Sequence, residues 1–373
     1  MQISLLQENL HSALTAVSRF VTSKAQLPIL NNILFQTDQG RLKLSATNLE
    51  LGINYWLGAK IETEGSFTIP AKELAEFISY LSPGKLDFDL NENHLLSITS
   101  LKAKSTFACT PTTDFPVLPS LNQSQSIVLN YQHLVESVNQ VAFAAATDDT
   151  RPVLTAVLCR FSPESISFVA TDGFRLSIKE IILDKPLVLP NNESLTLLIP
   201  SRTLQEITKL SKNTSSISFG SSTDQNQLVF VLEDLELVSR LIDGDFPDYQ
   251  RIVPQQFATK ITFNKDELSQ AIKVASVFAR ESANVVKMSI KSSQIILSAN
   301  APQIGENQVT LDAKIEGEPI DIAFNYKFIA DYSAVVKSDQ IILQLNESLT
   351  PGLFTDPLDV TFRHIIMPVR VQD

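Results

Sequence analysis

The sequence has 373 residues, of which 44% are hydrophobic and 19% are charged, and its formal net charge is −11. This composition is typical of a folded globular protein, and it excludes a strongly basic protein that holds nucleic acid mainly by neutralising phosphates. No apolar run approaches the roughly 18 residues of a membrane span, and the opening MQISLLQENL has no basic leader, so we expect a cytoplasmic protein without a membrane anchor.

The chain begins with a sequence motif, or phrase, that occurs twice more in altered form. It reads ISLLQENLHSALTAVSRF from Ile3, IVLNYQHLVESVNQVAFA from Ile127 and ITFNKDELSQAIKVASVF from Ile261. Each copy has apolar residues at intervals of three and four, which predicts a strand followed by an amphipathic helix, and Asn130 and Asn264 stand at N-cap positions. A spacing of roughly 130 residues is far longer than the 20 to 50 residues of a solenoid unit, so the repeat predicts whole domains.

A second phrase follows in each copy. It reads FTIPAKELAEFISYL around Pro70, LLIPSRTLQEITKL around Pro200 and IAFNYKFIADYS around Asn325, and it predicts a second helix. Alternating and β-branched runs between the helices predict strands that are joined by hairpins. The expected fold class is therefore α+β, with two helices and roughly eight strands per copy.

The repeat also gives the domain organisation. We expect a first domain over residues 1–121, a second over 127–253 and a third over 258–373. The polar stretches between them are short, which favours a fixed arrangement of the domains over a flexible string.

Individual residues give little sign of catalysis. Cys109 and Cys159 lie in strand-like surroundings and are expected to be small buried thiols. Glycine is scarce, and neither a GxGxxG nor a GxxxxGK[ST] loop occurs, so no nucleotide site is expected. The four histidines, at positions 11, 94, 133 and 364, lack the spacing of metal ligands. We therefore expect neither a metal nor a cofactor.

Three segments favour structural roles when each is taken alone. Thr171 to Leu176 contains Asp172-Gly173 between two strand-like runs, which is typical of a hairpin. LIDGDFPDYQRIVP, residues 241–254, is typical of a turn-rich domain end, and HIIMPVR, residues 364–370, of a last strand that its proline keeps at a sheet edge. The alternative is a hydrolytic or nucleolytic enzyme that uses Asp172 and Asp245 with His364, although no spacing of paired ligands supports it.

Taken together, these segments resemble the DNA polymerase III beta subunit family, the bacterial sliding clamps. Besides the repeat, the resemblance rests on LPILNNILF at 27–35, RPVLTAVL at 151–158, ATDGFRLSI at 170–178, the 241–254 segment and MPVR at 367–370. It covers essentially the whole chain in order. It implies three clamp domains, each with two helices on an inner face and two small antiparallel sheets outside, with sheets that continue across the domain joints.

The resemblance also implies an assembly and a way of holding DNA. Two chains would associate head to tail as a homodimer and close a ring of six domains around double-stranded DNA without sequence preference. A ring that encloses its template needs only weak phosphate contacts, so a net charge of −11 is compatible with this function. We expect the closing surfaces near 104–109 and 273–287. The candidate DNA-facing residues are Lys24, Arg151, Arg202, Lys209 and Lys212.

The same resemblance implies a non-catalytic processivity factor with a peptide-binding pocket between the second and third domains. Its partners would be the polymerase alpha subunit, the clamp-loader delta subunit and other clamp-motif proteins, which present short extended peptides with a few apolar side chains and a glutamine. The turn after Thr171 is expected to project Arg175 and Leu176. The candidate pocket residues, carried over by motif, are Leu154, Thr171, Gly173, Phe174, Arg175, Leu176, Pro247, Arg251, Ile252, Asn325, Phe328, Leu349, Met367, Pro368, Val369 and Arg370.

Overall fold

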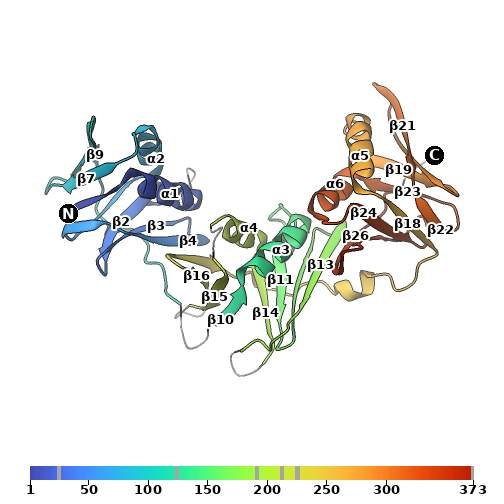
Figure 1. The fold of residues 1–373 in the computed structure, drawn as a ribbon, viewed down its shortest axis with the longest axis horizontal. Coiled ribbons are helices and arrows are strands. Elements are labelled where there is room, and N and C mark those ends of the chain that lie inside the picture. The colour runs from blue at the N-terminus through green and yellow to red at the C-terminus, as the bar shows by residue number, and fades with distance from the viewer. Residues whose placement is uncertain (23–26, 122–125, 190–192, 211–213, 223–226, 371–373) are drawn as a thin grey trace. The chain divides into compact units, whose positions relative to one another are not determined.

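The structure, a computed structural model, describes residues 1–22, 27–121, 126–189, 193–210, 214–222 and 227–370 (Figure 1). The order of strand, helix, strands, helix and further strands recurs three times along these residues, which confirms the predicted α+β class and its two helices per copy. The first repeat comprises β1 (Gln2–Leu6), α1 (Gln7–Val17), β2 (Asn32–Asp38), β3 (Arg41–Thr47), β4 (Leu51–Leu57), β5 (Lys60–Thr63), β6 (Ser66–Pro70), α2 (Ala71–Tyr80), β7 (Lys85–Leu90), β8 (Leu95–Thr99) and β9 (Lys104–Ala108).

The second and third repeats follow the same plan. The second comprises β10 (Ile127–Asn130), α3 (Tyr131–Val141), β11 (Ala156–Phe161), β12 (Ser165–Thr171), β13 (Arg175–Ile182), β14 (Leu195–Pro200), α4 (Ser201–Leu210), β15 (Ser216–Ser221), β16 (Gln227–Leu232) and β17 (Leu235–Arg240). The third comprises β18 (Thr259–Asn264), α5 (Lys265–Ala279), β19 (Val285–Ile290), β20 (Gln294–Ala301), β21 (Gly305–Asp312), β22 (Lys314–Gly317), β23 (Ile320–Asn325), α6 (Tyr326–Val335), β24 (Gln340–Leu345), β25 (Gly352–Asp356) and β26 (Asp359–Ile366).

Asparagine side chains start two of the helices. The side-chain oxygen of Asn264 accepts hydrogen bonds from the backbone N–H groups of Asp266 and Glu267, at 2.8 and 3.1 Å. The same oxygen of Asn325 accepts from the N–H of Lys327 at 3.0 Å. These bonds satisfy N–H groups that have no partner within the helix, so the predicted cap at Asn264 is confirmed.

The chain divides into two compact units. The first consists of Met1–Gln132 and Lys209–Leu241, and the second of His133–Thr208 and Ile242–Asp373. The middle repeat contributes strands to both units, so neither unit coincides with one repeat. The predicted limits of the three domains are a separate matter and stay a prediction.

The first unit contains two sheets. One has five strands in the order β5-β1-β7-β8-β9, and the other has eight in the order β10-β15-β16-β17-β4-β3-β2-β6. In the larger sheet β17 of the second repeat pairs antiparallel with β4 of the first, and Leu237 lies opposite Ile53. The predicted continuation of a sheet across a domain joint is therefore confirmed here.

The second unit repeats this arrangement. A nine-stranded sheet has the order β14-β11-β12-β13-β26-β25-β24-β18-β22, and a four-stranded sheet has the order β21-β20-β19-β23. β26 pairs with β13 on one side and β25 on the other, and Ser177 lies opposite His364. The expectation of an edge strand at residues 364–370 is wrong, because β26 is paired on both sides. Pro368 is tolerated because β26 ends at Ile366, so that the proline lies beyond the ladder and its missing N–H costs no hydrogen bond.

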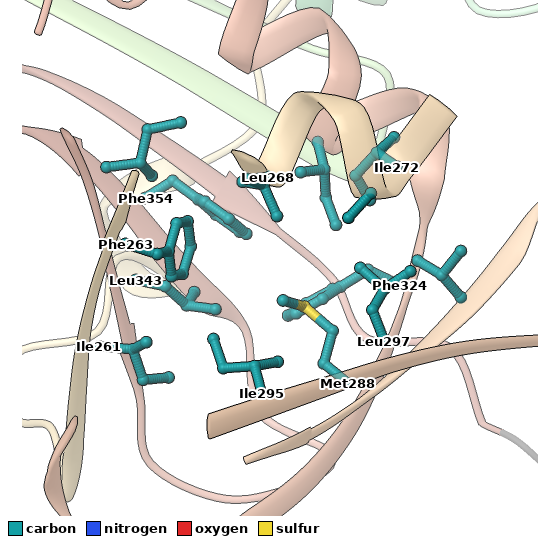
Figure 2. Close-up of a cluster of buried hydrophobic side chains, with 14 of the residues drawn as sticks. Ile261, Phe263, Leu268, Ile272, Met288, Ile295, Leu297, Phe324, Leu343 and Phe354 are labelled. Atoms are coloured by element: carbon teal, nitrogen blue, oxygen red, sulfur yellow. The ribbon is translucent and has the colours of Figure 1, made fainter. Parts of the chain in front are cut away.

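Side chains on the two faces of the nine-stranded sheet enter two separate cores. On one face a cluster that includes Phe263, Leu268, Met288 and Phe354 joins β18, β19 and β25 to helix α5 (Figure 2). On the other face Leu176, Ile178, Leu353 and Ile365 form a second cluster with Tyr249. Since successive strand residues point to opposite faces, this alternation is what a sheet covered on both sides requires.

The covering element of the second cluster is the connection between the second and third repeats. Its residues Ile242, Phe246, Tyr249, Val253 and Phe257 pack against the cluster. The connection therefore lies across the strands β13 and β26, which come from different repeats. This places the 241–254 segment beside the segments 151–158 and 170–178, on which the family resemblance also rests.

The two cysteines are free thiols. Cys159 is fully buried in β11, as predicted, whereas Cys109 is only partly buried, just after β9. Burial raises the pKa of the Cys109 thiol to about 11, and that of Cys159 is raised further for the same reason. Both thiols are therefore protonated and unreactive near neutral pH.

Candidate functional site

The turn between β12 and β13 is a hairpin connection, as the Asp172-Gly173 pair predicts. The hydroxyl of Thr171 accepts a hydrogen bond from the Gly173 N–H at 3.0 Å and donates one to the Arg175 carbonyl at 2.6 Å. The Asp172 carboxylate accepts from the N–H groups of Phe174 and Arg175, at 2.8 and 3.0 Å. Gly173 has a φ of +92°, a conformation that a side chain would strain. These bonds fix the turn in one conformation.

The end of β26 lies against this turn. The backbone N–H of Met367 donates to the carbonyl of Phe174 at 2.9 Å, and the N–H of Val369 donates to the carbonyl of Ala323 at 2.8 Å. The tail after β26 thus passes from the β12–β13 turn to β23. Two segments that are far apart in the sequence, 170–178 and 367–370, are in direct contact.

Arg175 is held inside this arrangement and is not projected from it, so that part of the prediction is wrong. Its side chain is 11% exposed. Its Nε donates to Asp172 at 3.0 Å, its Nη1 to Asp331 at 2.5 Å and its Nη2 to the Phe143 carbonyl at 2.6 Å. All three guanidinium nitrogens are used, which leaves Arg175 a structural link between the turn and helix α6.

Aromatic rings enclose the same guanidinium. Its central carbon lies 4.6 Å from the ring centre of Phe328 and 5.4 Å from that of Phe143. A cation above an aromatic face is attracted by the ring's quadrupole, most strongly when water is excluded. Phe328 therefore stabilises Arg175, and Asn325, which begins the same helix, orients α6 through its cap.

The apolar candidates divide into a buried floor and exposed flanks. The floor consists of Leu154 and Leu176, which are 7% and 2% exposed, so the predicted projection of Leu176 is also wrong. The turn exposes Phe174 (61%) and the tail exposes Met367 (38%), and the two segments are joined by the Met367 hydrogen bond. Apolar side chains exposed on a rigid frame are suited to bind a partner's apolar side chains.

The remaining candidates extend outward from this centre. Ile252 and Leu349 are 41% and 57% exposed, and Pro247 and Arg370 are exposed. Arg251 forms an ion pair with Asp248 at 2.8 Å on its own segment, with a side chain that is 87% exposed. The structure therefore joins the turn, the tail and helix α6 by direct contacts, and it gives Arg251 a local partner instead.

Sequence reasoning missed Phe143 and Asp331, which both contact Arg175. A signal for Phe143 was present, since each repeated helical phrase carries a phenylalanine near its end: Phe20, Phe143 and Phe278. No comparable signal existed for Asp331, because only the tertiary structure brings α6 to the turn.

His364 is buried behind the turn. Its ring stacks on Tyr332, with 5.2 Å between ring centres, and its Nδ1 lies 2.7 Å from the Ser177 hydroxyl. Burial, assisted by the positive charge of Arg175, lowers the pKa of His364 well below its usual value, so the ring is neutral. Because Asp172 is taken up by the turn and His364 is sealed in the core, these groups do not form the hydrolytic site that was the alternative.

The candidate DNA-facing residues are only partly described. Arg202 and Lys209 are exposed on helix α4. Arg151 is exposed and donates to the carbonyl of Asp172 at 3.2 Å, so it lies at the β12–β13 turn. Lys24 and Lys212 lie outside the described residues. Their role at DNA stays a prediction.

Two other features bear on function. Within the described ranges, no helix is long and apolar enough to cross a membrane. In the same part of the chain, no group of three or more His, Cys, Asp or Glu side chains could hold a metal ion.

Comparisons with known proteins agree with this architecture. The family models of the DNA polymerase III beta subunit match along the chain: the N-terminal domain at residues 1–119, the central domain at 128–248 and the C-terminal domain at 250–370. Three tandem domains of this type define the class, which is that of the DNA clamps. The chain belongs to the DNA polymerase III beta subunit family.

Individual relatives match over their whole length. The beta sliding clamp of Synechocystis is 32% identical, with all of both chains covered, and that of Bacillus subtilis is 29% identical, with 99% of this chain and all of the relative covered. The crystal structure of the Bacillus subtilis DNA polymerase sliding clamp superposes with a TM-score of 0.92 at 27% identity, over 100% of both chains. The chain is accordingly a non-catalytic processivity clamp of DNA replication.

Proposed function

We propose that two copies of this chain close head to tail into a ring of six domains that encloses double-stranded DNA. The observation that carries the proposal is a free strand edge on a sheet of each unit. β9, with Lys104 to Ala108, is an edge of the five-stranded sheet, and β21 is an edge of the four-stranded sheet. Pairing of one copy's β9 with another copy's β21 would repeat in a closed ring, as a heterologous contact requires.

The expected surface at residues 273–287 stays a prediction. This region runs from α5 into β19, and β19 lies between β20 and β23, so it offers no free edge. The expected surface at residues 104–109 coincides with the edge strand β9. We therefore place the closing contact of the third repeat at β21.

A proline in β9 tests this contact. The N–H of Cys109 donates to the carbonyl of His94 across the β8–β9 ladder, and alternation places the N–H of Thr106 on the free edge. Thr106→Pro removes an edge donor without breaking the ladder, so light scattering should show a monomer where the wild type is a dimer. Thr106→Ala is the matched control and should remain dimeric. A monomeric wild type would contradict the ring.

Enclosure of DNA has its own test. Protein placed on nicked circular DNA by its loader should remain there in moderate salt and run off when the circle is cut, because a ring is held by topology and not by phosphate contacts. Equal retention on circular and linear DNA would indicate ordinary affinity instead. Lys24, Arg151, Arg202, Lys209 and Lys212 would supply only weak attraction, so Arg202→Ala should leave retention on the circle unchanged.

The second part of the proposal is that the turn, the tail and their flanks bind short extended peptides from other replication proteins. Phe174 and Met367 are exposed, Leu154 and Leu176 are buried, and the β12–β13 turn is fixed by four hydrogen bonds. A solved relative from Bartonella birtlesii, 27% identical with a TM-score of 0.92 over all of both chains, is described as bound to griselimycin. Relatives of this fold therefore do hold a separate molecule.

The partners of this site would be the polymerase alpha subunit, the clamp-loader delta subunit and other proteins with a clamp-binding segment, in the bacterial cytoplasm. Met367→Ala should weaken the binding of such a peptide by about 1 to 3 kcal/mol, because an exposed anchor contact is lost. Isothermal titration calorimetry measures the affinity, and light scattering checks that the dimer persists. Unchanged affinity in Met367→Ala, Phe174→Ala and Leu154→Ala would place the binding surface elsewhere.

A further inference from the structure

The peptide-docking surface of the second unit is built on a frame that consists of the turn Thr171 to Arg175, the strand end at Met367 and the buried Leu154 and Leu176. The first unit contains a second copy of this frame. Its turn between β3 and β4, Thr47 to Leu51, corresponds to Thr171 to Arg175 in the repeat. In each unit a short 3-10 turn with a proline comes first, Pro28–Asn31 in one case and Pro152–Thr155 in the other. One strand follows it, β2 or β11, and the turn then joins the next two strands, β3 to β4 or β12 to β13. The same backbone is thus built twice in one chain.

The hydrogen bonds of the two turns match one by one. The Thr47 hydroxyl donates to the Leu51 carbonyl at 2.9 Å and accepts from the Leu49 N–H at 3.0 Å. The Asn48 side chain accepts from the N–H groups of Glu50 and Leu51, at 3.0 and 2.8 Å, as Asp172 does in the other copy. Leu49 has a φ of +75°, in the place where Gly173 has +92°.

The strand end that bonds to each turn also corresponds between the two units. The N–H of Arg240, at the end of β17, donates to the Glu50 carbonyl at 3.0 Å. The corresponding bond in the second unit joins Met367 to Phe174 at 2.9 Å. Arg240 and Glu50 therefore occupy the positions of Met367 and Phe174.

The apolar floor is kept in both copies by different means. Leu30, 3% exposed, corresponds to Leu154. Gly52 corresponds to Leu176, and a Cβ at Gly52 would lie 2.5 Å from Cδ2 of Leu118, so the Leu118 side chain fills the place where the Leu176 side chain begins. Leucine side chains therefore occupy both of these places in each unit.

The exposed flanks of the two frames differ in kind. The second unit has a glycine, a phenylalanine and a methionine there, whereas the first unit has Leu49, Glu50 and Arg240. In the second unit the Arg151 guanidinium lies 3.3 Å from where a Cβ of Gly173 would be. In the first unit Leu49 is 45% exposed, and Glu50 and Arg240 are both exposed. An apolar peptide anchor placed there would have to desolvate two charges without a matching partner.

We propose that Leu49, Glu50 and Arg240 are specificity-determining residues that keep the first-unit frame closed to apolar-anchored peptides. Each chain then binds one such peptide although it contains two frames. The inference rests on the proposed docking function of the second unit, and it adds the reason why docking is confined to one of the two copies.

A graft tests the inference on the full-length protein. The probe is a fluorescein-labelled extended hexapeptide with one glutamine and three leucines. In a background of Phe174→Ala and Met367→Ala, affinity for the probe should fall at least about 100-fold. Adding Leu49→Gly, Glu50→Phe and Arg240→Met to this background should restore binding to within about tenfold of the wild type. The same graft in the wild-type background should raise the stoichiometry from one peptide per chain to two.

A matched control carries similar substitutions away from the frame, Lys60→Met and Glu64→Phe, and should restore nothing. A grafted protein that unfolds like the wild type and binds no probe would overturn the inference, and so would a wild type that binds two peptides per chain. A wild type that binds none would instead show that the docking function itself is wrong, and the inference would fall with it.

The reciprocal exchange does not depend on the folding of the graft. Phe174→Glu with Met367→Arg puts the first unit's charges into the second-unit frame and should abolish binding of the probe, at least about 100-fold. Phe174→Tyr with Met367→Leu keeps the flanks apolar and should stay within about threefold of the wild type. Retained affinity in the charged variant would overturn the inference.

Discussion

The guanidinium of Arg175 lies 2.5 Å from the carboxylate of Asp331, and this contact joins the β12–β13 turn of the second repeat to helix α6 of the third. Both residues belong to the same compact unit. Because Arg175 also bonds Asp172 and the Phe143 carbonyl, it positions Phe174 without offering its own charge to a partner. The two predictions that follow from such a role are a loss of peptide affinity and a loss of stability when the contact is removed.

Asp331→Ala removes one of the three acceptors of Arg175. We expect the affinity for a docking peptide to fall by roughly threefold to tenfold and the free energy of unfolding by about 1 to 3 kcal/mol, since a largely buried cation loses a charged partner. Calorimetry and urea unfolding measure the two effects. The control Asp321→Ala breaks an exposed pair with Lys287 and should change neither quantity; an equal effect of both variants would contradict a positioning role for Arg175.

The pair of Lys179 and Asp359 links β13 to β26, with side chains that are 8% and 10% exposed and atoms 2.5 Å apart. Lys179→Met leaves Asp359 buried without its cation, so we expect a loss of about 3 to 5 kcal/mol in urea unfolding. The exposed pair of Lys60 and Glu62 provides the control, and Lys60→Met should stay within about 0.5 kcal/mol of the wild type. A small effect at Lys179 would mean that the sheet joint does not depend on this pair.

Asp359 also predicts a dependence on acid. Burial by itself raises the pKa of this carboxyl, but hydrogen bonds from Lys179, Thr361 and Gln140 outweigh burial and hold it below its unfolded value of 3.8. The stabilisation is therefore complete above that value and is lost as the pH falls through the lower folded pKa. Urea midpoints between pH 5 and pH 2 should fall less steeply for Asp359→Asn than for the wild type.

His364 predicts a pH dependence nearer neutrality. Its pKa in the folded protein lies well below the unfolded value of 6.5, so below pH 6.5 the unfolded chain takes up a proton that the folded protein refuses. Stability should then fall with decreasing pH, by up to about 1.4 kcal/mol per pH unit. His364→Phe keeps a ring against Tyr332 and should flatten the curve of unfolding free energy between pH 7.5 and pH 5.5. Parallel curves for variant and wild type would show that His364 does not titrate in this way.

Gly317, at the end of β22, stands at a position where we expect that no side chain is tolerated. It has a φ of +120°, and a Cβ there would lie 2.2 Å from the carbonyl oxygen of Ala258. Gly317→Ala should lower the free energy of unfolding by at least about 2 kcal/mol, because the strand must move away from β18. At Gly58 a Cβ would have no atom within 4 Å and the φ is not positive, so Gly58→Ala should be nearly neutral in thermal unfolding.

The amino-acid sequence alone determined the local structure. The repeated motifs predicted six helices and, at Asn264, the start of one of them, because 3.6-residue periodicity and a side-chain cap act over only a few residues. The Asp172-Gly173 turn was likewise readable, because glycine's freedom and the aspartate's hydrogen bonds are local. The resemblance of whole segments then gave the family.

Only the tertiary structure decided how the segments meet. The pairing of β13 with β26 and of β4 with β17 joins different repeats, and no local pattern specifies which strand edge meets which. That pairing brings Asp331 to Arg175 and turns an expected exposed arginine into a buried link. Local propensity chooses turns and helices, whereas long-range burial and hydrogen bonding, which act between residues distant in the chain, decide which side chains remain outside to bind a partner.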